Sequence, residues 1–282
     1  MLGLLLIYRV VVSEMNLEAF AELHATALEA DEVRFNLQVA VLAMVLKECP
    51  PGFRTWTLGA PGHCAFQWPG RAILLGNLDQ GECEDLARKA AAIDYQGVVG
   101  SDDMPRWFVE QAVALGAQFE EPIPQSIQVI RTAPHTPNVP GEARDIGVAD
   151  APLLFEWLVA FQREAVPHDP PPVRANAEKV AASGRFLFWM VEGVPVSMAA
   201  VTRRLRATGA IAPVYTPVEH RGRGYAGAVT AAVVDKLFAE GKTAVCLYTD
   251  LRNPMSNRCY ARIGFTRHCD SWHYLRRSPT AA

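Results

Sequence analysis

The chain has 282 residues, more than one compact core usually takes, so we expect two domains. Half of the residues are hydrophobic, a fifth are charged and the formal net charge is −3, which is typical of a soluble globular protein. Lysine and arginine form no dense cluster, so the sequence argues against a nucleic-acid partner.

The first twelve residues, MLGLLLIYRVVV, are strongly apolar. They are too few to span a bilayer, which takes about 20 apolar residues. A signal peptide would begin with basic residues and end in a small-residue cleavage site, whereas here Arg9 interrupts the apolar run and Glu14 follows it. We interpret it as an initial strand or as an extension upstream of Met15, and we expect a cytoplasmic protein without a membrane partner.

Hydrophobic periodicity in the first half predicts two helices followed by three strands. After these come a helix, a strand, a second helix and a last strand. The helices are expected at 17–28, 33–46, 82–92 and 104–115, and the strands at 53–58, 64–68, 72–75, near Val98 and at 127–131.

A proline-rich stretch follows at 132–141 (TAPHTPNVPG). Three prolines in ten residues favour an extended connector over a helix or a central strand. We therefore predict a first domain at 1–132, a linker at 133–142 and a second domain at 143–282.

The second half is predicted to begin with a strand and then to follow an order similar to that of the first half: two helices, three strands, a helix, a strand, a helix and a strand. Asp150 is suited to cap the first of these helices, Pro254 to open the last and Gly264 to end it. The strands are expected at 143–148, 185–191, 196–201, 209–215, 245–248 and 265–275, and the helices from 150, at 173–182, at 225–240 and from 254. The repeated order indicates an α/β (α+β) protein built by structural duplication.

The strand that ends at Tyr215 leads through a loop with Gly222 and Gly224 into a helix at Tyr225. Glycines allow a tight turn and a close approach of a ligand, and a helix start offers unpaired amides and a positive dipole end. With Arg221 and Arg223 beside them, these features favour a diphosphate site. An ordinary strand-to-helix turn remains the alternative, because two glycines alone do not distinguish the two.

Arg221, Gly224 and Ala226 resemble the coenzyme A signature Arg/Gln-x-x-Gly-x-Gly/Ala of the GNAT superfamily. The segment 249–265 (TDLRNPMSNRCYARIGF) is similar to the family's second signature, carried here by Asn253, Ser256, Asn257, Tyr260, Gly264 and Phe265. The resemblance covers about 143–275 and looks closest to a bacterial two-domain type. It implies tandem GNAT-like domains, each a mixed twisted sheet flanked by helices. The first is degenerate, because its corresponding loop at 76–81 has no arginine.

The resemblance further implies an acyl-coenzyme A-dependent N-acyltransferase without a metal. The implied reaction moves acetyl from acetyl-coenzyme A to a primary amine of a small molecule or peptide by direct attack. A main-chain amide at Val214–Tyr215 would stabilise the oxyanion, and Tyr260 would protonate the leaving thiolate. The implied coenzyme A-binding residues are Val214, Tyr215, Thr216, Arg221, Gly222, Arg223, Gly224, Tyr225, Ala226, Asn253, Ser256 and Asn257.

Several alternatives stay open. Tyr260 is also compatible with a role in core packing. The domain is also compatible with a non-catalytic acyl-coenzyme A sensor, or with an enzyme that uses longer acyl chains. The general base is not identified; the candidates are Glu164, His168, Glu219, Asp250 and Asp270. Trp272, His273 and Tyr274 either line an acceptor pocket or fill the core.

Overall fold

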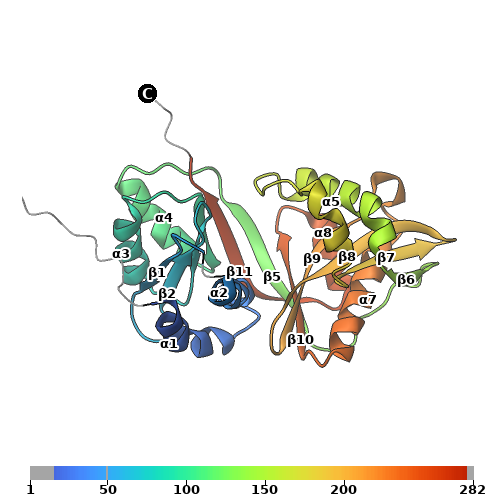
Figure 1. Cartoon of the computed structure of the whole chain (residues 1–282), viewed down its shortest axis with the longest axis horizontal. Helices are drawn as coiled ribbons and strands as arrows, with labels where there is room; N and C mark the ends of the chain where they lie inside the picture. The colour runs from blue at the N-terminus through green and yellow to red at the C-terminus, as the bar shows by residue number, and fades with distance from the viewer. Residues whose placement is uncertain (1–15, 49, 278–282) are drawn as a thin grey trace, which may run out of the picture. The chain divides into compact units, whose positions relative to one another are not determined.

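The computed structural model describes residues 16–48 and 50–277 (Figure 1). The chain divides into two compact units, one formed by Met1–Gln125 with Cys269–Ala282 and the other by Ser126–His268. The apolar segment 1–12 lies outside the described residues. Among the helices of the described ranges, none is long and apolar enough to cross a membrane.

The first unit has a mixed sheet in the order β1-β2-β3-β4-β11. Its neighbours are antiparallel except β3 and β4, which are parallel. The elements of this unit are α1 (Leu17–Glu29), α2 (Asn36–Glu48), β1 (Arg54–Thr57), β2 (Cys64–Gln67), β3 (Ile73–Leu75), α3 (Gln80–Ala90), β4 (Gly97–Ser101), α4 (Met104–Ala114) and most of β11 (Thr266–Leu275).

The second unit has a mixed sheet in the order β5-β10-β9-β8-β7-β6. Its strands from β6 to β9 are antiparallel, and β9 is parallel to β10. The elements are most of β5 (Ile123–Ile130), β6 (Glu142–Asp145), α5 (Ala151–Ala165), α6 (Ala177–Ala181), β7 (Phe186–Val191), β8 (Val194–Arg204), β9 (Thr208–Tyr215), α7 (Tyr225–Ala239), β10 (Ala244–Asp250) and α8 (Pro254–Ile263).

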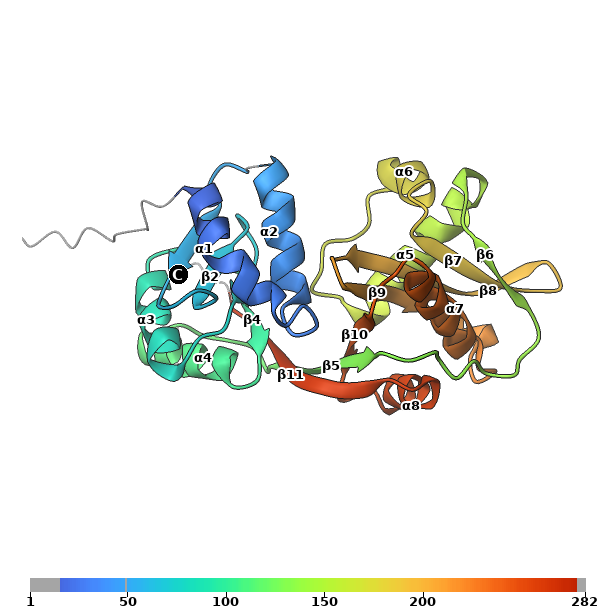
Figure 2. The same cartoon turned by 90° about the horizontal axis from the view of Figure 1, so that it is seen from below.

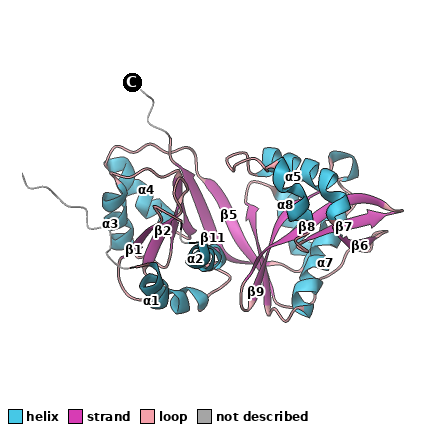
Figure 3. Ribbon diagram, in the orientation of Figure 1, coloured by secondary structure: helices cyan, strands magenta, loops and turns pink. Residues whose placement is uncertain are grey.

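Helices cover both faces of the second unit's sheet (Figure 3). On β7, Leu187 and Trp189 are buried in the cluster formed with α7, whereas Phe186 and Phe188 are buried in the cluster formed with α5. Successive side chains of a strand point to opposite faces, so α5 and α7 lie on opposite sides of the sheet. The loop between β9 and α7 connects the end of a strand in this sheet to the helix that covers one of its faces.

The predicted order of helices and strands is confirmed in both halves, as is the tandem arrangement of two mixed α/β sheets. Differences are confined to the ends of elements. The strand expected at 143–148 ends at Asp145, and a short 3-10 turn follows at Val148–Asp150. Asp150 precedes α5 as expected but does not cap it: its carboxylate accepts hydrogen bonds from Gly147 N and from Arg144.

The boundaries of the compact units differ from the predicted domain boundaries. Both unit boundaries fall inside strands, one in β5 and the other in β11. The chain enters the second unit within β5, before the predicted linker. The end of β11 belongs to the first unit, since residues 271–275 pair with β4. Trp272, His273 and Tyr274 accordingly lie opposite residues of β4. Which strand pairs with which is decided by the tertiary structure, and the hydrophobic periodicity of a sequence does not predict it.

Residues 133–141 of the predicted linker form an extended segment without helix or strand that packs on the second unit, and its last residue, Glu142, begins β6 (Figure 2). His135 N donates to Ile263 O at 2.8 Å, and Trp189 Nε1 donates to Pro140 O at 3.0 Å. Val139 packs against the core cluster around α7. We call residues 135–140 the strap, because these contacts hold them against α7, α8 and β7.

We expect Trp189→Phe to lower the free energy of unfolding by about 1 kcal/mol more than Trp157→Phe does. Both changes remove the same part of a buried indole, but only Trp189 loses a hydrogen bond, the one to the strap. Urea unfolding of the two variants measures the difference. Equal losses would show that the strap contributes no stability through this bond.

Candidate active site

The site lies where β9 and β10 stop pairing. Their parallel register runs from Thr208–Ala244 to Ile211–Leu247, although β9 continues to Tyr215 and β10 to Asp250. The register between β8 and β9 also shifts in this region, which marks a bulge. The two strand ends therefore part, and backbone groups along the facing edges are left for a ligand. Val214 and Tyr215 form this end of β9, and Thr216 follows it.

The loop after β9 ends in an unfilled row of amides at the start of α7. Gly222 and Gly224 have φ values of +77° and +84°, a left-handed conformation that favours glycine. Within the described chain, the amides of residues 222–227 donate no hydrogen bond. The first amide that is bonded is Ala228 N, which donates to Gly224 O at 3.1 Å. Such a row of unpaired amides at a helix start is suited to bind an anion.

The two arginines of the loop differ in their surroundings. Arg221 Nε donates to Thr216 O at 2.9 Å, and its Nη2 pairs with Glu164 Oε2 at 2.6 Å. Arg223 is exposed and makes no ion pair or side-chain hydrogen bond with the described residues. Arg223 is therefore available to pair with an anion bound at the start of α7.

The start of α8 holds the residues of the second predicted signature. Asn253 caps the helix, because its Oδ1 accepts from Met255 N and Ser256 N at 3.2 and 3.1 Å. Asn257 bridges back to the end of β10, donating from Nδ2 to Asp250 O and accepting at Oδ1 from Thr249 Oγ1.

Ser256 Oγ likewise lies within hydrogen-bond distance of Asn253 O and Thr249 Oγ1. The side chains of Ser256 and Asn257 thus fasten α8 to β10, a structural role that sequence analysis did not assign to them. The Asn253 Nδ2 group donates no hydrogen bond within the described residues.

Tyr260 lies two helical turns after Asn253. Its ring packs on the core cluster under α7 and stands edge-on to Phe265, with 6.0 Å between ring centroids. Burial raises the pKa of its phenol, and the neighbouring Cys259 adds to the rise. The hydroxyl stays protonated at neutral pH and has no hydrogen-bond partner among the described residues. The ring is packed, as the core interpretation expects, while the proton remains available for donation.

Among the candidate bases, Glu164 at the end of α5 contacts two predicted site residues, Arg221 and Tyr215. Asp250 is less suited to take up a proton. Burial alone would raise its pKa, but hydrogen bonds from the side chain and backbone of Arg252 hold the pKa below its usual value. Asp270 belongs to the first unit, and Glu219 is exposed.

The corresponding helix start in the first unit, at α3, is closed by its own side chains. Asp79 Oδ1 accepts from Glu82 N and Glu82 Oε2 accepts from Asp79 N, both at 2.9 Å. Glu82 also pairs with His63 Nδ1 at 2.8 Å. Two carboxylates occupy the amides that an anion would need, and they would repel it. This arrangement supports the expectation that the first domain has lost the cofactor.

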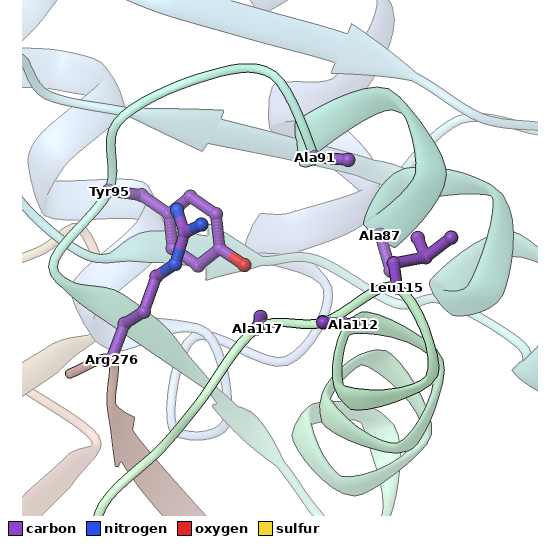
Figure 4. Close-up of a pocket in the computed structure, with 8 residues that line it drawn as sticks. Ala87, Ala91, Tyr95, Ala112, Leu115, Ala117 and Arg276 are labelled. Atoms are coloured by element: carbon purple, nitrogen blue, oxygen red, sulfur yellow. The ribbon is translucent and has the colours of Figure 1, made fainter. Parts of the chain in front are cut away.

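A cavity of about 100 Å³ lies in the first unit, away from this helix start (Figure 4). Its lining is small and apolar apart from Tyr95 and Arg276, whose guanidinium lies 4.3 Å above the Tyr95 ring. The helical lining residues come from the C-terminal ends of α3 and α4, so the cavity is not the counterpart of the α7 site. Among the described residues, no group of three or more His, Cys, Asp or Glu side chains could hold a metal ion.

Two features of the site escaped sequence analysis. The first is the contact between Glu164 and Arg221, which are 57 residues apart and share no motif. The second is the strap beside α7: a Cβ at Gly224 would lie 3.0 Å from Val139, and one at Gly227 would lie 3.0 Å from Pro137. These glycines therefore also admit the strap, so a bulky change at Gly224 would disturb the fold as well as ligand binding.

Comparisons with known proteins agree with this geometry. The family model described as acetyltransferase (GNAT) family matches residues 151–265. No curated protein matches the chain in sequence.

Three solved structures with TM-scores above 0.5 are similar in fold. A Drosophila protein has a TM-score of 0.64 at 12% identity, covering 93% of this chain and 97% of that one. A GCN5-related N-acetyltransferase from Kribbella flavida has a TM-score of 0.58 at 18% identity, covering 87% and 96%. A tandem GNAT protein from the clavulanic acid biosynthesis pathway has a TM-score of 0.53 at 12% identity, covering 91% and 96%. At these identities the likeness concerns the fold.

We expect Gly222→Ala to weaken coenzyme A binding at least about tenfold, a loss of about 1.4 kcal/mol, because it perturbs the loop that presents the amides. Gly241→Ala is the matched control, since Gly241 has φ +84°, has open space around it and follows the other end of α7. Both substitutions should cost about 1 kcal/mol of stability through backbone strain. Calorimetric titration with coenzyme A and thermal unfolding separate the effects; equal affinities for the two variants would contradict the assignment of the loop.

Proposed function

We propose that the protein transfers acetyl from acetyl-coenzyme A to a primary amine of a small molecule or peptide, because residues 151–265 match the family model described as acetyltransferase (GNAT) family. The observation that carries this proposal is the row of unpaired amides at residues 222–227, next to the parted ends of β9 and β10. A diphosphate satisfies these amides, and Arg223 adds an unengaged positive charge beside them.

The remaining contacts to acetyl-coenzyme A follow from the geometry around this anchor. Val214 and Tyr215 lie where β9 no longer pairs with β10, and Thr216 follows them; backbone groups on that side can bond the amides of the pantetheine arm. Asn253 Nδ2, at the start of α8, is a further donor for that arm. Ser256 and Asn257 contribute by holding α8 against β10, which keeps Asn253 and Tyr260 in place.

The reaction needs an uncharged amine, because its lone pair attacks the thioester carbonyl carbon. The carbonyl oxygen becomes negative, and a main-chain amide at Val214–Tyr215 stabilises it. When the carbon–sulfur bond breaks, the thiolate takes a proton from the Tyr260 hydroxyl. The nitrogen releases one proton to solvent as the amide forms, and solvent returns one proton to the tyrosinate, so the protons balance. The products are an N-acetylated amine and coenzyme A thiol.

Tyr260 favours an enzyme over a non-catalytic acyl-coenzyme A sensor, since a sensor has no use for an unpaired proton donor on α8. The direct test is thiol release from acetyl-coenzyme A across a panel of amines, amino acids and peptides. Release that depends on an added acceptor is expected. Binding of acetyl-coenzyme A without release for any acceptor would indicate the sensor, and faster release from longer acyl thioesters would correct the acyl group.

We expect one molecule of coenzyme A to bind per chain. The start of α7 presents free amides, whereas the start of α3 is closed by Asp79 and Glu82. Calorimetry on the full chain gives the stoichiometry. Two molecules per chain would contradict the loss of the cofactor site in the first domain.

We expect Tyr260→Phe to lower kcat by about 10²–10⁴, the usual contribution of a positioned acid, with little change in the KM for acetyl-coenzyme A. The phenyl ring preserves the packing against Phe265 but cannot donate a proton. Tyr95→Phe is the control, because it removes the hydroxyl of a buried tyrosine in the first unit. Single-turnover rates are the measurement, since slow product release can hide a loss in chemistry. A Tyr260→Phe rate within a few-fold of wild type would leave this residue with a packing role only.

A further inference from the structure

Glu164, Tyr215 and Arg221 form a half-exposed cluster at the end of β9, next to the place assigned to the acyl group. Glu164 Oε2 pairs with Arg221 Nη2 at 2.6 Å, and Glu164 Oε1 lies 3.4 Å from the Tyr215 hydroxyl. The side chains of Glu164 and Arg221 are 46% and 45% exposed, so solvent and small solutes reach them.

This cluster has the composition of a cation site. A carboxylate beside an aromatic ring attracts cations through both charge and the ring quadrupole. A cation already lies there, since the Arg221 guanidinium is 5.9 Å from the Tyr215 ring centroid. Among the described residues, Glu164 Oε1 receives only the long contact from Tyr215, so it retains lone pairs for another N–H donor. A ligand cation can therefore bind without displacing Arg221.

The chemistry of the reaction limits which cation this can be. A nitrogen that Glu164 holds as an ammonium has its lone pair bound to a proton and cannot attack the thioester. The amine that is acetylated must be neutral at that moment, so the charge held by Glu164 belongs to a different group of the acceptor.

We propose that Glu164 and Tyr215 form an acceptor subsite for a second positive charge, so that the preferred acceptors are small diamines in which one amine is acetylated and the other is held as a cation. The inference rests on the proposed acetyl transfer. It assigns Glu164, one of the candidate bases, to recognition of the acceptor.

The test compares 1,4-diaminobutane with butylamine in equilibrium titrations of the full chain, with and without saturating coenzyme A. Wild type should bind the diamine at least about fivefold more tightly, the size of effect expected for one half-exposed ion pair. Glu164→Gln keeps the shape and removes the charge, and it should abolish the preference. Glu240→Gln is the matched control, because Glu240 likewise pairs with an arginine: its carboxylate accepts two hydrogen bonds from Arg204, at the other end of α7.

Equal binding of the two amines by wild type, or an unchanged preference in Glu164→Gln, would overturn the subsite. The subsite would also be overturned if Glu164→Gln lowered kcat as much for butylamine as for the diamine and changed the pH profile. That result would identify Glu164 as a general base. Titrations at saturating coenzyme A separate an effect on cofactor affinity from one on the subsite. A wild type that prefers the diamine but releases no thiol would refute acetyl transfer and leave the subsite standing.

Discussion

The parting of two parallel strands is the constraint on which the candidate site depends. β9 and β10 pair only as far as Ile211 and Leu247, and then continue as separate strand ends. Without this break, the edge of β9 on the β10 side would pair with β10 beyond Ile211. With it, that edge is left for a ligand, although Val214 and Tyr215 still pair with β8 on the other side. The amides of residues 222–227, at the start of α7, donate no hydrogen bond within the described chain either. The strand break thus supplies polar groups for the arm of the ligand, and the helix start supplies those for its diphosphate.

The two halves of the chain show how side chains decide the use of one backbone arrangement. Each half has a helix that follows three strands, and each helix start has amides that need a partner. At α3 the partners are Asp79 and Glu82, which satisfy the amides and add negative charge. At α7 the first turn has no acidic residue, and arginines precede it. The same fold therefore excludes an anion in one unit and favours one in the other.

Packing of the strap links the stability of the second unit to its candidate site. Val139 and Pro137 lie against Gly224 and Gly227, while Trp189 and Ile263 hold the strap through hydrogen bonds. Gly224 is consequently constrained twice, by its positive φ and by the strap. A substitution at that position mixes stability with ligand affinity, whereas Gly222, with open space around it, separates them better.

The sequence by itself determined the order of helices and strands, the glycine loop before α7 and the position of Tyr260 two turns after Asn253. These are local properties, set by periodicity, capping and glycine conformation over short stretches of chain. The tertiary structure alone decided that the end of β11 pairs with β4, that Asn257 fastens α8 to β10 and that Glu164 meets Arg221. The physical reason is that these contacts join residues distant in sequence or on different elements, whose approach depends on how the sheet is assembled and leaves no periodic pattern along the chain.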